Sequence, residues 1–287
     1  MRLRLEYGRD GLEADVPDSA TVLSMTAPPP LDDQPAESRR ALDHPIGTPT
    51  LRELARGRGD AVIVVCDVTR PVPNPVVLPE MLDDLAREGI PASRVTILVA
   101  TGTHRPNDEA ELRRMLGDRV VDECPIVNHD CTDASRLRYL GDSPHGVPVW
   151  LNTVYLDASL KITLGMIEPH FMAGYAGGRK MVMPGVAGLD SVRDWHSPRF
   201  LEHPLATNGV LDGNPVHESL LAIVAMAPPD FSFDCALDAR KGLARGFAGH
   251  YLEAWLAGVA YVEATVRAPI DGPCDLVITT CGGHPLD

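Results

Sequence analysis

The sequence predicts an α/β protein with a parallel or mixed sheet flanked by helices and a ligand site at the carboxyl ends of the strands. Continuous β-branched apolar runs at residues 61–66, 94–100 and 159–165 are typical of strands buried on both faces. The first two runs are separated by a helix pattern, in the spacing of a βαβ unit with parallel strands. Polar residues follow each run directly.

Composition excludes several classes of protein. The 287 residues are 44% apolar, enough for one large or two modest domains with a core. The net charge of −14 argues against nucleic acid or an anionic membrane as the main partner. No apolar run reaches the roughly 18 residues that span a bilayer and no signal peptide is evident, so we expect a cytoplasmic protein. The six cysteines include no C-x-x-C pair and are interpreted as reduced, buried side chains.

The first half of the chain is expected to alternate strands and helices. Charged and apolar residues alternate around glycines at residues 1–17, which predicts a hairpin. Asn74 before Pro75 supplies an N-cap and a first-turn proline, and Asn107 is expected to cap the next helix. The other expected elements are a helix at 36–42, helices at 75–89 and 107–117, and a short strand at 125–128.

The second half leads to a predicted domain boundary. The expected elements are helices at 189–200, 215–226 and 249–266 and strands at 231–237 and 275–280. A buried strand at 275–280 needs a covering helix, and the turn from Cys281 to Asp287 should lead into it. We therefore expect residues 1–268 to form an N-terminal catalytic and cofactor-binding domain. Residues 269–287 are expected to be the first strand and turn of a truncated C-terminal α/β domain.

The most distinctive stretch is residues 168–196, EPHFMAGYAGGRKMVMPGVAGLDSVRDWH. Glycine loses the most backbone freedom on folding, so a glycine-rich run around Lys180 indicates close approach of the backbone to a ligand. The run is not a Walker loop, because Arg179 precedes the lysine and Met181 follows it. The G-x-G-x-x-G dinucleotide fingerprint is absent too.

Three polar segments each follow a predicted strand directly. They are residues 67–70 (DVTR), 101–105 (TGTHR) and 168–170 (EPH). In open parallel α/β sheets, ligands bind outside the carboxyl ends of the strands. We therefore expect the three segments to meet at one site.

Within these segments, three side chains have suitable chemistry for catalysis. The Arg70 guanidinium can hold a carboxylate or phosphate with paired hydrogen bonds. His104 and His170 can serve as general acid and base on opposite sides of one site. The remaining histidines with no such placement are interpreted as structural: His44, His129, His145, His203, His250 and His284.

Lys180 and His196 each allow several interpretations. Lys180 can be a surface lysine, a phosphate ligand among glycine N–H groups, or a covalent attachment site. His196 can be a packed side chain or a ligand for nickel, copper or zinc. The residues alone leave these alternatives open.

Several long motifs carry a family resemblance. DVTRPVPN, ATGTHRP, EPHFMAGYAGGRKMVMPG and the histidine of DWH, in that order, resemble the nickel-dependent lactate racemase family. ALDHPIGTP, GNPVHE and GGHPLD are similar to it as well. The resemblance covers essentially the whole chain and is more specific than any single short motif.

The resemblance implies a cofactor and its protein contacts. The family's cofactor is pyridinium-3,5-bisthiocarboxylic acid mononucleotide, which binds nickel through two sulfurs and a carbon. By resemblance, Lys180 is joined covalently to one thio-acid and His196 completes the nickel coordination. Ribose and phosphate contacts are implied for Asp67, Thr69, Thr101, Gly177 and Gly178.

The resemblance also implies an activity and partners. His104 and His170 match the family's catalytic histidines, and Arg70 matches the group that holds the substrate carboxylate. The implied function is racemisation of a lactate-like 2-hydroxy acid by reversible hydride transfer to the cofactor. The alternatives are 2-epimerisation of longer hydroxy acids or sugar acids, and a non-catalytic carrier of the nickel cofactor. Implied partners are cofactor-biosynthesis and nickel-insertion proteins and the C-terminal domain.

Overall fold

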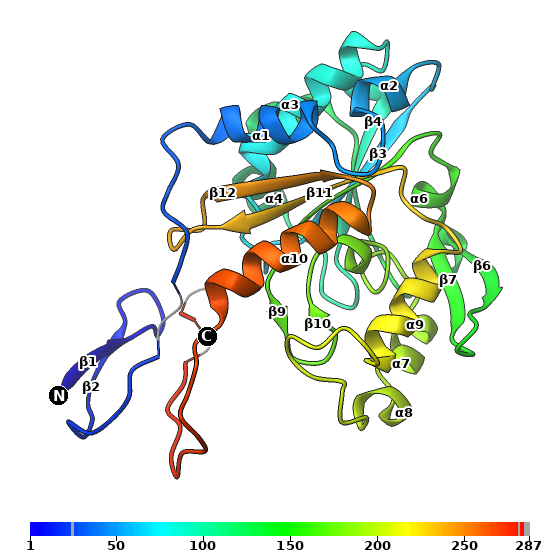
Figure 1. Cartoon of the computed structure of the whole chain (residues 1–287). Helices are drawn as coiled ribbons and strands as arrows, with labels where there is room; N and C mark the ends of the chain where they lie inside the picture. The colour runs from blue at the N-terminus through cyan, green and yellow to red at the C-terminus, as the bar shows by residue number, and fades with distance from the viewer. Residues whose placement is uncertain (24–25, 281, 284–287) are drawn as a thin grey trace. The chain divides into compact units, whose positions relative to one another are not determined.

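The computed structural model describes residues 1–23, 26–280 and 282–283. The chain divides into two units, Ala27–Ala264 and a smaller one made of Met1–Thr26 with Thr265–Asp287. The larger unit contains a six-stranded sheet in the order β12-β11-β8-β3-β4-β5, shown in Figure 1. No described helix is both long enough and apolar enough to cross a membrane.

The sheet is mixed, as predicted. Only the β11–β12 pair is antiparallel among the pairings of this sheet in the described part of the chain, and the other four are parallel. The apolar runs form its buried centre because their side chains face helices on both sides. The strands are β3 (Ala61–Cys66), β4 (Val95–Ala100), β5 (Ile126–Asn128), β8 (Lys161–Met166), β11 (Phe231–Leu237) and β12 (Leu243–Gly249).

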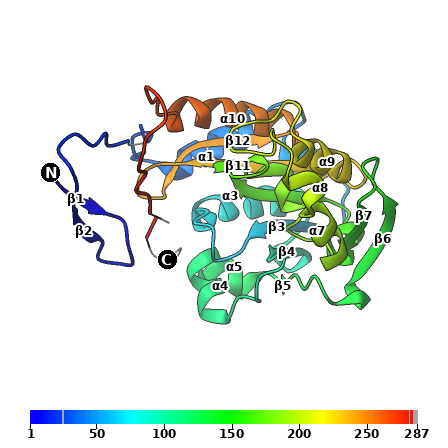
Figure 2. The ribbon, with the colours of Figure 1, turned by 90° about the horizontal axis from the view of Figure 1, so that it is seen from below.

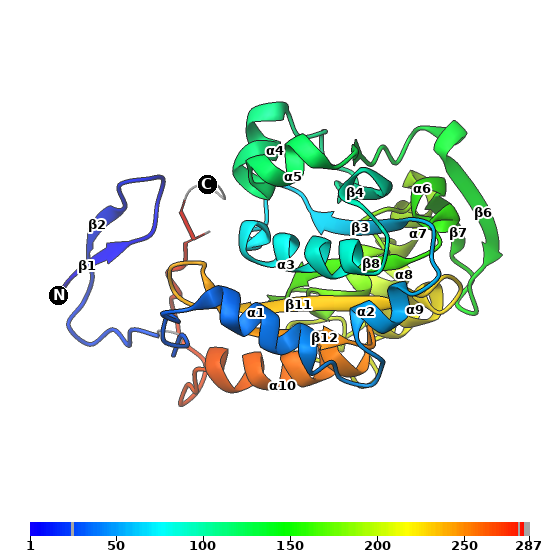
Figure 3. The ribbon, with the colours of Figure 1, turned by 90° about the horizontal axis from the view of Figure 1, so that it is seen from above.

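Alternate side chains of the central strand point into two separate cores. Ile63 and Val65 pack in one core, and Val62 and Val64 pack in the other. Figure 3 shows α1 and α3 of the first face side by side. This face carries α1 (Gln34–Asp43), α2 (Leu51–Ala55), α3 (Asn74–Arg87), α4 (Glu109–Leu116) and α5 (Asp118–Glu123).

The opposite face carries the helices that follow β7. Figure 1 shows α1 and α10 on opposite sides of β11 and β12. Correspondingly, a side chain at Gly246 would meet Ala41 of α1, whereas Phe247 lies against Gly258 of α10. The helices of this face are α6 (Thr153–Asp157), α7 (Leu189–Trp195), α8 (Pro198–Leu201), α9 (Pro215–Val224) and α10 (Glu253–Val266).

Short hairpins and turns complete the fold. The predicted N-terminal hairpin is confirmed as an antiparallel pair in the smaller unit. A second hairpin, β6–β7, lies beside α7 in Figures 1 and 2. These elements are β1 (Arg2–Leu5), β2 (Leu12–Asp15), β6 (Leu137–Asp142), β7 (Pro148–Asn152), β9 (Pro169–His170), β10 (Gly174–Tyr175), and the 3₁₀ turns η1 (Ala92–Arg94), η2 (Ala134–Arg136) and η3 (Gly178–Met181).

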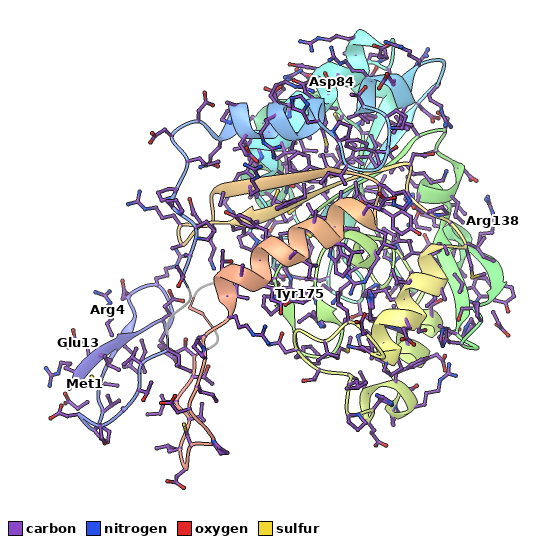
Figure 4. The ribbon with its side chains drawn as sticks, in the orientation of Figure 1. Met1, Arg4, Glu13, Asp84, Arg138 and Tyr175 are labelled. Atoms are coloured by element: carbon purple, nitrogen blue, oxygen red, sulfur yellow. The ribbon has the colours of Figure 1, made fainter. Side chains whose placement is uncertain are left out.

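A buried carboxylate joins the helices of the first face. Asp84 of α3, labelled in Figure 4, accepts two hydrogen bonds from the Arg39 guanidinium at 3.0 and 2.7 Å. It also lies 3.7 Å from the guanidinium of Arg52. Two parallel hydrogen bonds between arginine and a carboxylate are stronger than a hydrogen bond between neutral groups. Through these contacts, Asp84 connects α1 and α2 to α3.

Two predicted helix caps are wrong. Asn74 is the first residue of α3 rather than its cap, and its side-chain amide donates to the Met115 carbonyl. The cap of α4 is Asp108 rather than Asn107. Asp108 is the cap because Glu111 lies three residues later. The side chain of each residue accepts a hydrogen bond from the backbone N–H of the other, which forms a capping box.

Between residues 189 and 266 the structure differs from the prediction in three elements. The helix expected at 189–200 is two helices, because Pro198 lacks an N–H and disfavours a helical residue before it. Strand β12 was not predicted, because glycine is rare in strands. Gly246 and Gly249 lie within β12, and Gly242 directly precedes it. Gly249 there has φ +135°, and a Cβ would lie 2.1 Å from the Ile46 carbonyl oxygen. Helix α10 consequently begins at Glu253 instead of residue 249.

The strand expected at 275–280 does not form. Leu276 and Val277 are 77% and 74% exposed. A strand requires hydrogen bonds to a neighbouring strand, and none of the described strands pairs with these residues. Residues 281 and 284–287 of the expected turn lie outside the described residues, so the domain boundary at 268 stays a prediction.

Candidate active site

The three polar segments after β3, β4 and β8 lie at one edge of the sheet. These strands are adjacent and parallel, so their carboxyl ends point the same way. A cavity of about 230 Å³ opens there. It is lined by eight of the ten residues named from the sequence, which are Asp67, Thr69, Arg70, Thr101, His104, Gly177, Lys180 and His196. His170 and Gly178 are outside this lining.

The chain path explains why the cavity forms at this position. From β3 the chain continues through α3 to β4 on one side, whereas β8 and then β11 are added on the other side of β3. The connecting helices lie on opposite faces of the sheet. Their loops separate where the strand order reverses, which leaves a crevice at the ends of β3 and β8.

Asp67 fixes the orientation of His104. Its carboxylate Oδ2 lies 2.6 Å from His104 Nδ1, and its Oδ1 accepts from the Thr69 hydroxyl at 2.6 Å. The Asp67 carboxylate is buried, whereas the His104 side chain is 54% exposed, so the ring is accessible from the cavity and from solvent. A carboxylate at Nδ1 favours a proton on that nitrogen, which leaves a lone pair on His104 Nε2. His104 is thus arranged as a general base.

Arg70 forms weak contacts that a ligand can replace. Its Nε lies 3.5 Å from Glu168 Oε1, and its Nη1 donates to the Thr69 carbonyl and hydroxyl oxygens at 3.3 Å. Arg70 and Glu168 are both more than a third exposed. Exposed ion pairs contribute little, so an anion entering the cavity can compete for the guanidinium. Sequence reasoning did not anticipate the contact with Glu168.

His170 has a different environment from His104. Its Nδ1 accepts long hydrogen bonds from the backbone N–H groups of Met172 and Ala173, at 3.4 and 3.3 Å. In the neutral ring the proton is then on Nε2. Burial first, and then the nearby cations of Lys180 and Arg70, lower the pKa of His170 to about 3.

Lys180 is placed in the cavity by a tight glycine turn. Gly177 has φ +80°, and a Cβ there would lie 2.7 Å from the Met166 carbonyl oxygen, so only glycine fits. The turn leads into η3, which contains Lys180. Burial first, then the charges of Arg179 and Arg70, lower the pKa of Lys180 to about 7. A substantial fraction of its amine is therefore neutral and nucleophilic near neutral pH.

His196 ends α7 with one ring nitrogen free. Its Nδ1 lies 2.8 Å from the Val192 carbonyl oxygen, which favours a proton on Nδ1 and a lone pair on Nε2. Burial lowers the pKa of His196, so the ring is kept neutral. A neutral imidazole with its other nitrogen bonded to a carbonyl is the usual form of a histidine metal ligand. Among the described residues, no group of three His, Cys, Asp or Glu side chains forms a metal site.

Two of the predicted cofactor contacts are occupied by protein. The Thr101 hydroxyl donates to the His129 carbonyl at 2.5 Å, so only its oxygen lone pairs remain available. The Gly178 N–H donates to Asp234 Oδ1 at 2.7 Å, behind the cavity. The geometry therefore does not support the predicted contact between Gly178 and a cofactor.

Sequence reasoning missed the buried polar residues behind the site. They are Arg179, His217, Asp234 and Trp255. Arg179 was considered only as a reason to exclude a Walker loop, and GNPVHE only as part of the resemblance. These residues are far apart along the chain and follow no recognised spacing, so no local signal could have grouped them.

Fold and site together define an α/β protein with a cavity lined by titratable side chains at the carboxyl ends of parallel strands. Comparison with known proteins then identifies its family. Residues 7–209 match the lactate racemase N-terminal domain family. The chain belongs to this family, which confirms the resemblance drawn from its motifs.

Two relatives and one solved structure support this assignment. The chain is 35% identical over 291 aligned residues to the lactate racemase of Thermoanaerobacterium thermosaccharolyticum, covering 99% of this chain and 67% of the relative. It is 40% identical over 249 residues to the lactate racemase of Lactiplantibacillus plantarum, covering 86% of this chain and 58% of the relative.

The solved structures extend the likeness to three dimensions. The lactate racemase apoprotein of T. thermosaccharolyticum matches with a TM-score of 0.91 and 34% identity, over 100% of this chain and 68% of that one. A protein of Thermotoga maritima matches with a TM-score of 0.68 and 21% identity, over 85% of this chain and 63% of that one, and this shows a shared fold.

Proposed function

We propose that this chain provides the cofactor-binding and acid–base residues of an isomerase that racemises lactate or a similar 2-hydroxy acid. The family assignment and the two lactate racemase relatives support this proposal. The observation that carries it is the cavity in which the Asp67–His104 pair faces Lys180 and His196. A carrier of the cofactor would need the lysine and the metal ligand but not a histidine oriented by a carboxylate.

The residues present fit a nickel-containing cofactor, which membership of the family implies. Lys180 offers a partly neutral amine for covalent attachment, and Gly177 leaves room because it has no side chain. His196 offers a free Nε2, and nickel accepts imidazole. The proposed cofactor is the pyridinium-3,5-bisthiocarboxylic acid mononucleotide, with Thr69 and Thr101 lining its binding site.

The protein side of the reaction follows from these positions. When bound, the cofactor supplies the acceptor for the hydride that leaves the substrate's α-carbon. Arg70 would bind the substrate carboxylate in place of Glu168, and His104 Nε2 would take the hydroxyl proton. Asp67 would stabilise the imidazolium that results. The product of hydride loss is a planar 2-keto acid, which can accept hydride on either face.

His170 would exchange the proton on the other side of the substrate. Its pKa is low first because it is buried, but the positive charges of Lys180 and Arg70 contribute. Attachment of the lysine removes one of these charges, and a substrate carboxylate neutralises the other. We therefore expect the pKa of His170 to rise in the complex, which makes it able to donate a proton to the returning alkoxide.

The test is racemisation and α-hydrogen exchange of both lactate enantiomers by protein carrying the cofactor. The protein is produced together with cofactor-biosynthesis and nickel-insertion proteins, and nickel is quantified in the same sample. Racemisation without exchange of the α-hydrogen with solvent supports hydride transfer. A panel of longer 2-hydroxy acids tests the epimerase alternative. Nickel-containing protein that acts on neither lactate nor the panel, even when the predicted C-terminal domain is supplied, would leave the carrier function instead.

A further inference from the structure

Arg179 is buried beside the lysine of the candidate site. It is 1% exposed and lies between Gly178 and Lys180 in η3. A buried guanidinium costs several kcal/mol unless hydrogen bonds and opposite charge compensate it. For Arg179, the compensating hydrogen bonds and ring contact come from residues of several elements.

The Arg179 guanidinium connects the glycine-rich segment to α9 and α10. Its Nε donates to His217 Nδ1 at 3.0 Å, and its Nη2 donates to the carbonyls of Ala173 and Tyr175 at 2.9 and 3.2 Å. Its Cζ lies 3.8 Å from the centroid of the Trp255 ring, within range of a cation–π interaction. Nη1 has no hydrogen-bond partner among the described residues. Tyr175 is labelled in Figure 4.

The same segment is bound from β11 and α10 at two further backbone groups. The Gly178 N–H donates to Asp234 Oδ1 at 2.7 Å, and the Ala176 carbonyl accepts from Trp255 Nε1 at 2.7 Å. A Cβ at Gly178 would lie 2.9 Å from the Trp255 ring, so the backbone and the ring are in close contact. Residues 173–178 are thus fixed on the side away from the cavity.

This anchoring determines the direction of the next side chain. In a 3₁₀ turn, which has three residues per turn, successive side chains point about 120° apart. Arg179 points into the protein behind the cavity, and Lys180 lines the cavity itself. Any rotation of the turn that freed Arg179 would move the Lys180 amine as well.

We propose that Arg179 is a positioning residue for Lys180. Its bonds to His217 and to the Ala173 and Tyr175 carbonyls hold η3 so that the lysine amine stays in the cavity, in place for the covalent attachment proposed above. The purpose assigned to Lys180 rests on the proposed function. The placement itself does not, because it concerns the protein without cofactor.

The test is the pH profile of Lys180 acylation in the protein without cofactor. The sequence has three lysines, at positions 161, 180 and 241, so peptide mass spectrometry resolves them all. Acetylation by an N-hydroxysuccinimide ester is followed against pH, with exposed Lys241 as the internal reference. The expected midpoint for Lys180 is about 7. Charged and titratable groups acting on Lys180 or on its neighbouring histidines are Cys66, Arg70, Glu168, His170, Arg179 and His196.

Arg179→Met and Arg179→Lys separate positioning from charge. Both variants remove the forked hydrogen bonds, so both should let the amine reach water and raise the midpoint by about one unit or more. Arg179→Lys retains a cation beside Lys180. If its midpoint equals that of the parent, charge alone explains the parent value and the positioning proposal is wrong.

A second pair of variants tests the contact without altering Arg179. His217→Gln keeps an acceptor for Arg179 Nε and should retain the parent midpoint, whereas His217→Leu should raise it. Leu82→Ala, in the core on the opposite face, is the control for general destabilisation and should leave the midpoint unchanged. Equal midpoints in His217→Leu and the parent, or a raised midpoint in Leu82→Ala, would overturn the proposal. Failure to find nickel or racemisation would bear on the proposed function only.

Discussion

The ionisable groups on the two sides of the cavity have different environments: one side pairs a histidine with a carboxylate, and in the described part of the chain the other buries its basic groups without an acidic partner. On the side of β3 and β4, Asp67 and His104 form a short carboxylate–imidazole pair at 2.6 Å. On the side of residues 168–196, His170, Lys180 and His196 have no hydrogen-bonded acidic partner among the described residues. Burial is the largest cause of the lowered pKa of each of these three groups.

The difference suits two chemical tasks under the proposed function. A carboxylate at one ring nitrogen fixes the tautomer of an imidazole and leaves a lone pair on the other nitrogen, which suits a residue that must accept a proton. Burial without a counter-charge favours neutral amines and imidazoles, which suits nucleophilic attachment and metal coordination. The proposed function therefore assigns proton transfer to one side of the cavity and cofactor binding to the other.

The largest expected effect is on attachment at the neutral side. Lys180→Ala should abolish the covalent adduct of mononucleotide size, because no other lysine lines the cavity. Intact mass before and after denaturation measures it, with Lys241→Ala as the matched control. His196→Ala should keep the adduct and release nickel more readily. An adduct that persists in Lys180→Ala would show that the cofactor is not attached at Lys180.

The next effect compares the two histidines directly. His104→Ala and His170→Ala should each reduce racemisation on the order of 10²-fold or more, the usual scale for a positioned acid or base. Cofactor and nickel content should stay near the parent values. A variant that racemises at the parent rate would return its histidine to a structural role.

Asp67→Asn tests whether the carboxylate pair itself matters. The amide oxygen can still accept from His104 Nδ1, but it carries no charge to stabilise the imidazolium. We expect a loss of roughly tenfold to a hundredfold in kcat, smaller than that of His104→Ala. Asp130→Asn changes a carboxylate that accepts from the Thr132 hydroxyl in the same way but lies outside the cavity lining, so it is the matched control. An Asp67→Asn enzyme with unchanged kcat would show that the pair is not used.

The lowered pKa of Lys180 should make the free energy of unfolding depend on pH. The pKa of Lys180 is about 7 in the folded protein and 10.5 for the ordinary group, so the unfolded chain binds more protons between these values. The free energy of unfolding of the cofactor-free protein therefore gains a contribution that rises with pH from about 7 to 10.5 and is lost as pH falls. Urea unfolding of the parent and Lys180→Met across this range measures it. Parallel profiles for the two proteins would contradict the lowered pKa.

The smallest expected effect concerns the contact between Arg70 and Glu168, which lie on opposite sides of the cavity. Glu168 competes with a substrate carboxylate for Arg70, so Glu168→Gln should lower KM with little change in kcat. An exposed ion pair contributes up to about 1 kcal/mol, which corresponds to a decrease of about fivefold at most. Steady-state kinetics with lactate measures it. An increase in KM would show that Glu168 orients Arg70 instead of competing for it.

Local sequence was sufficient for the central strands and for part of the cavity lining. The apolar runs of β3, β4 and β8 specify strands buried on both faces, and parallel strands align their carboxyl ends. This is why Asp67, Arg70 and His104 could be predicted at one site from the sequence. The predicted attachment at Lys180 and metal ligation at His196 came from the family resemblance, because the residues alone left the alternatives open.

Local sequence was insufficient where a residue's partner comes from elsewhere in the chain. Asp67 and His104 are 37 residues apart, and Arg179 and His217 are 38 apart, so their hydrogen bonds exist only after folding. Asn74 is a suitable cap by its residue type, yet its side chain bonds Met115 from another helix. Residues 275–280 have the composition of a strand, but a strand also needs a neighbour.

The sequence by itself thus determined the α/β class, the edge of the sheet that carries the site and several of the lining side chains, because these depend on apolar periodicity and on residues next to strand ends. Only the tertiary structure decided which of the three histidines is paired with a carboxylate, which are kept neutral by burial, and which arginine is exposed to ligands. Those properties depend on desolvation and on contacts between distant segments, and neither is present in the unfolded chain.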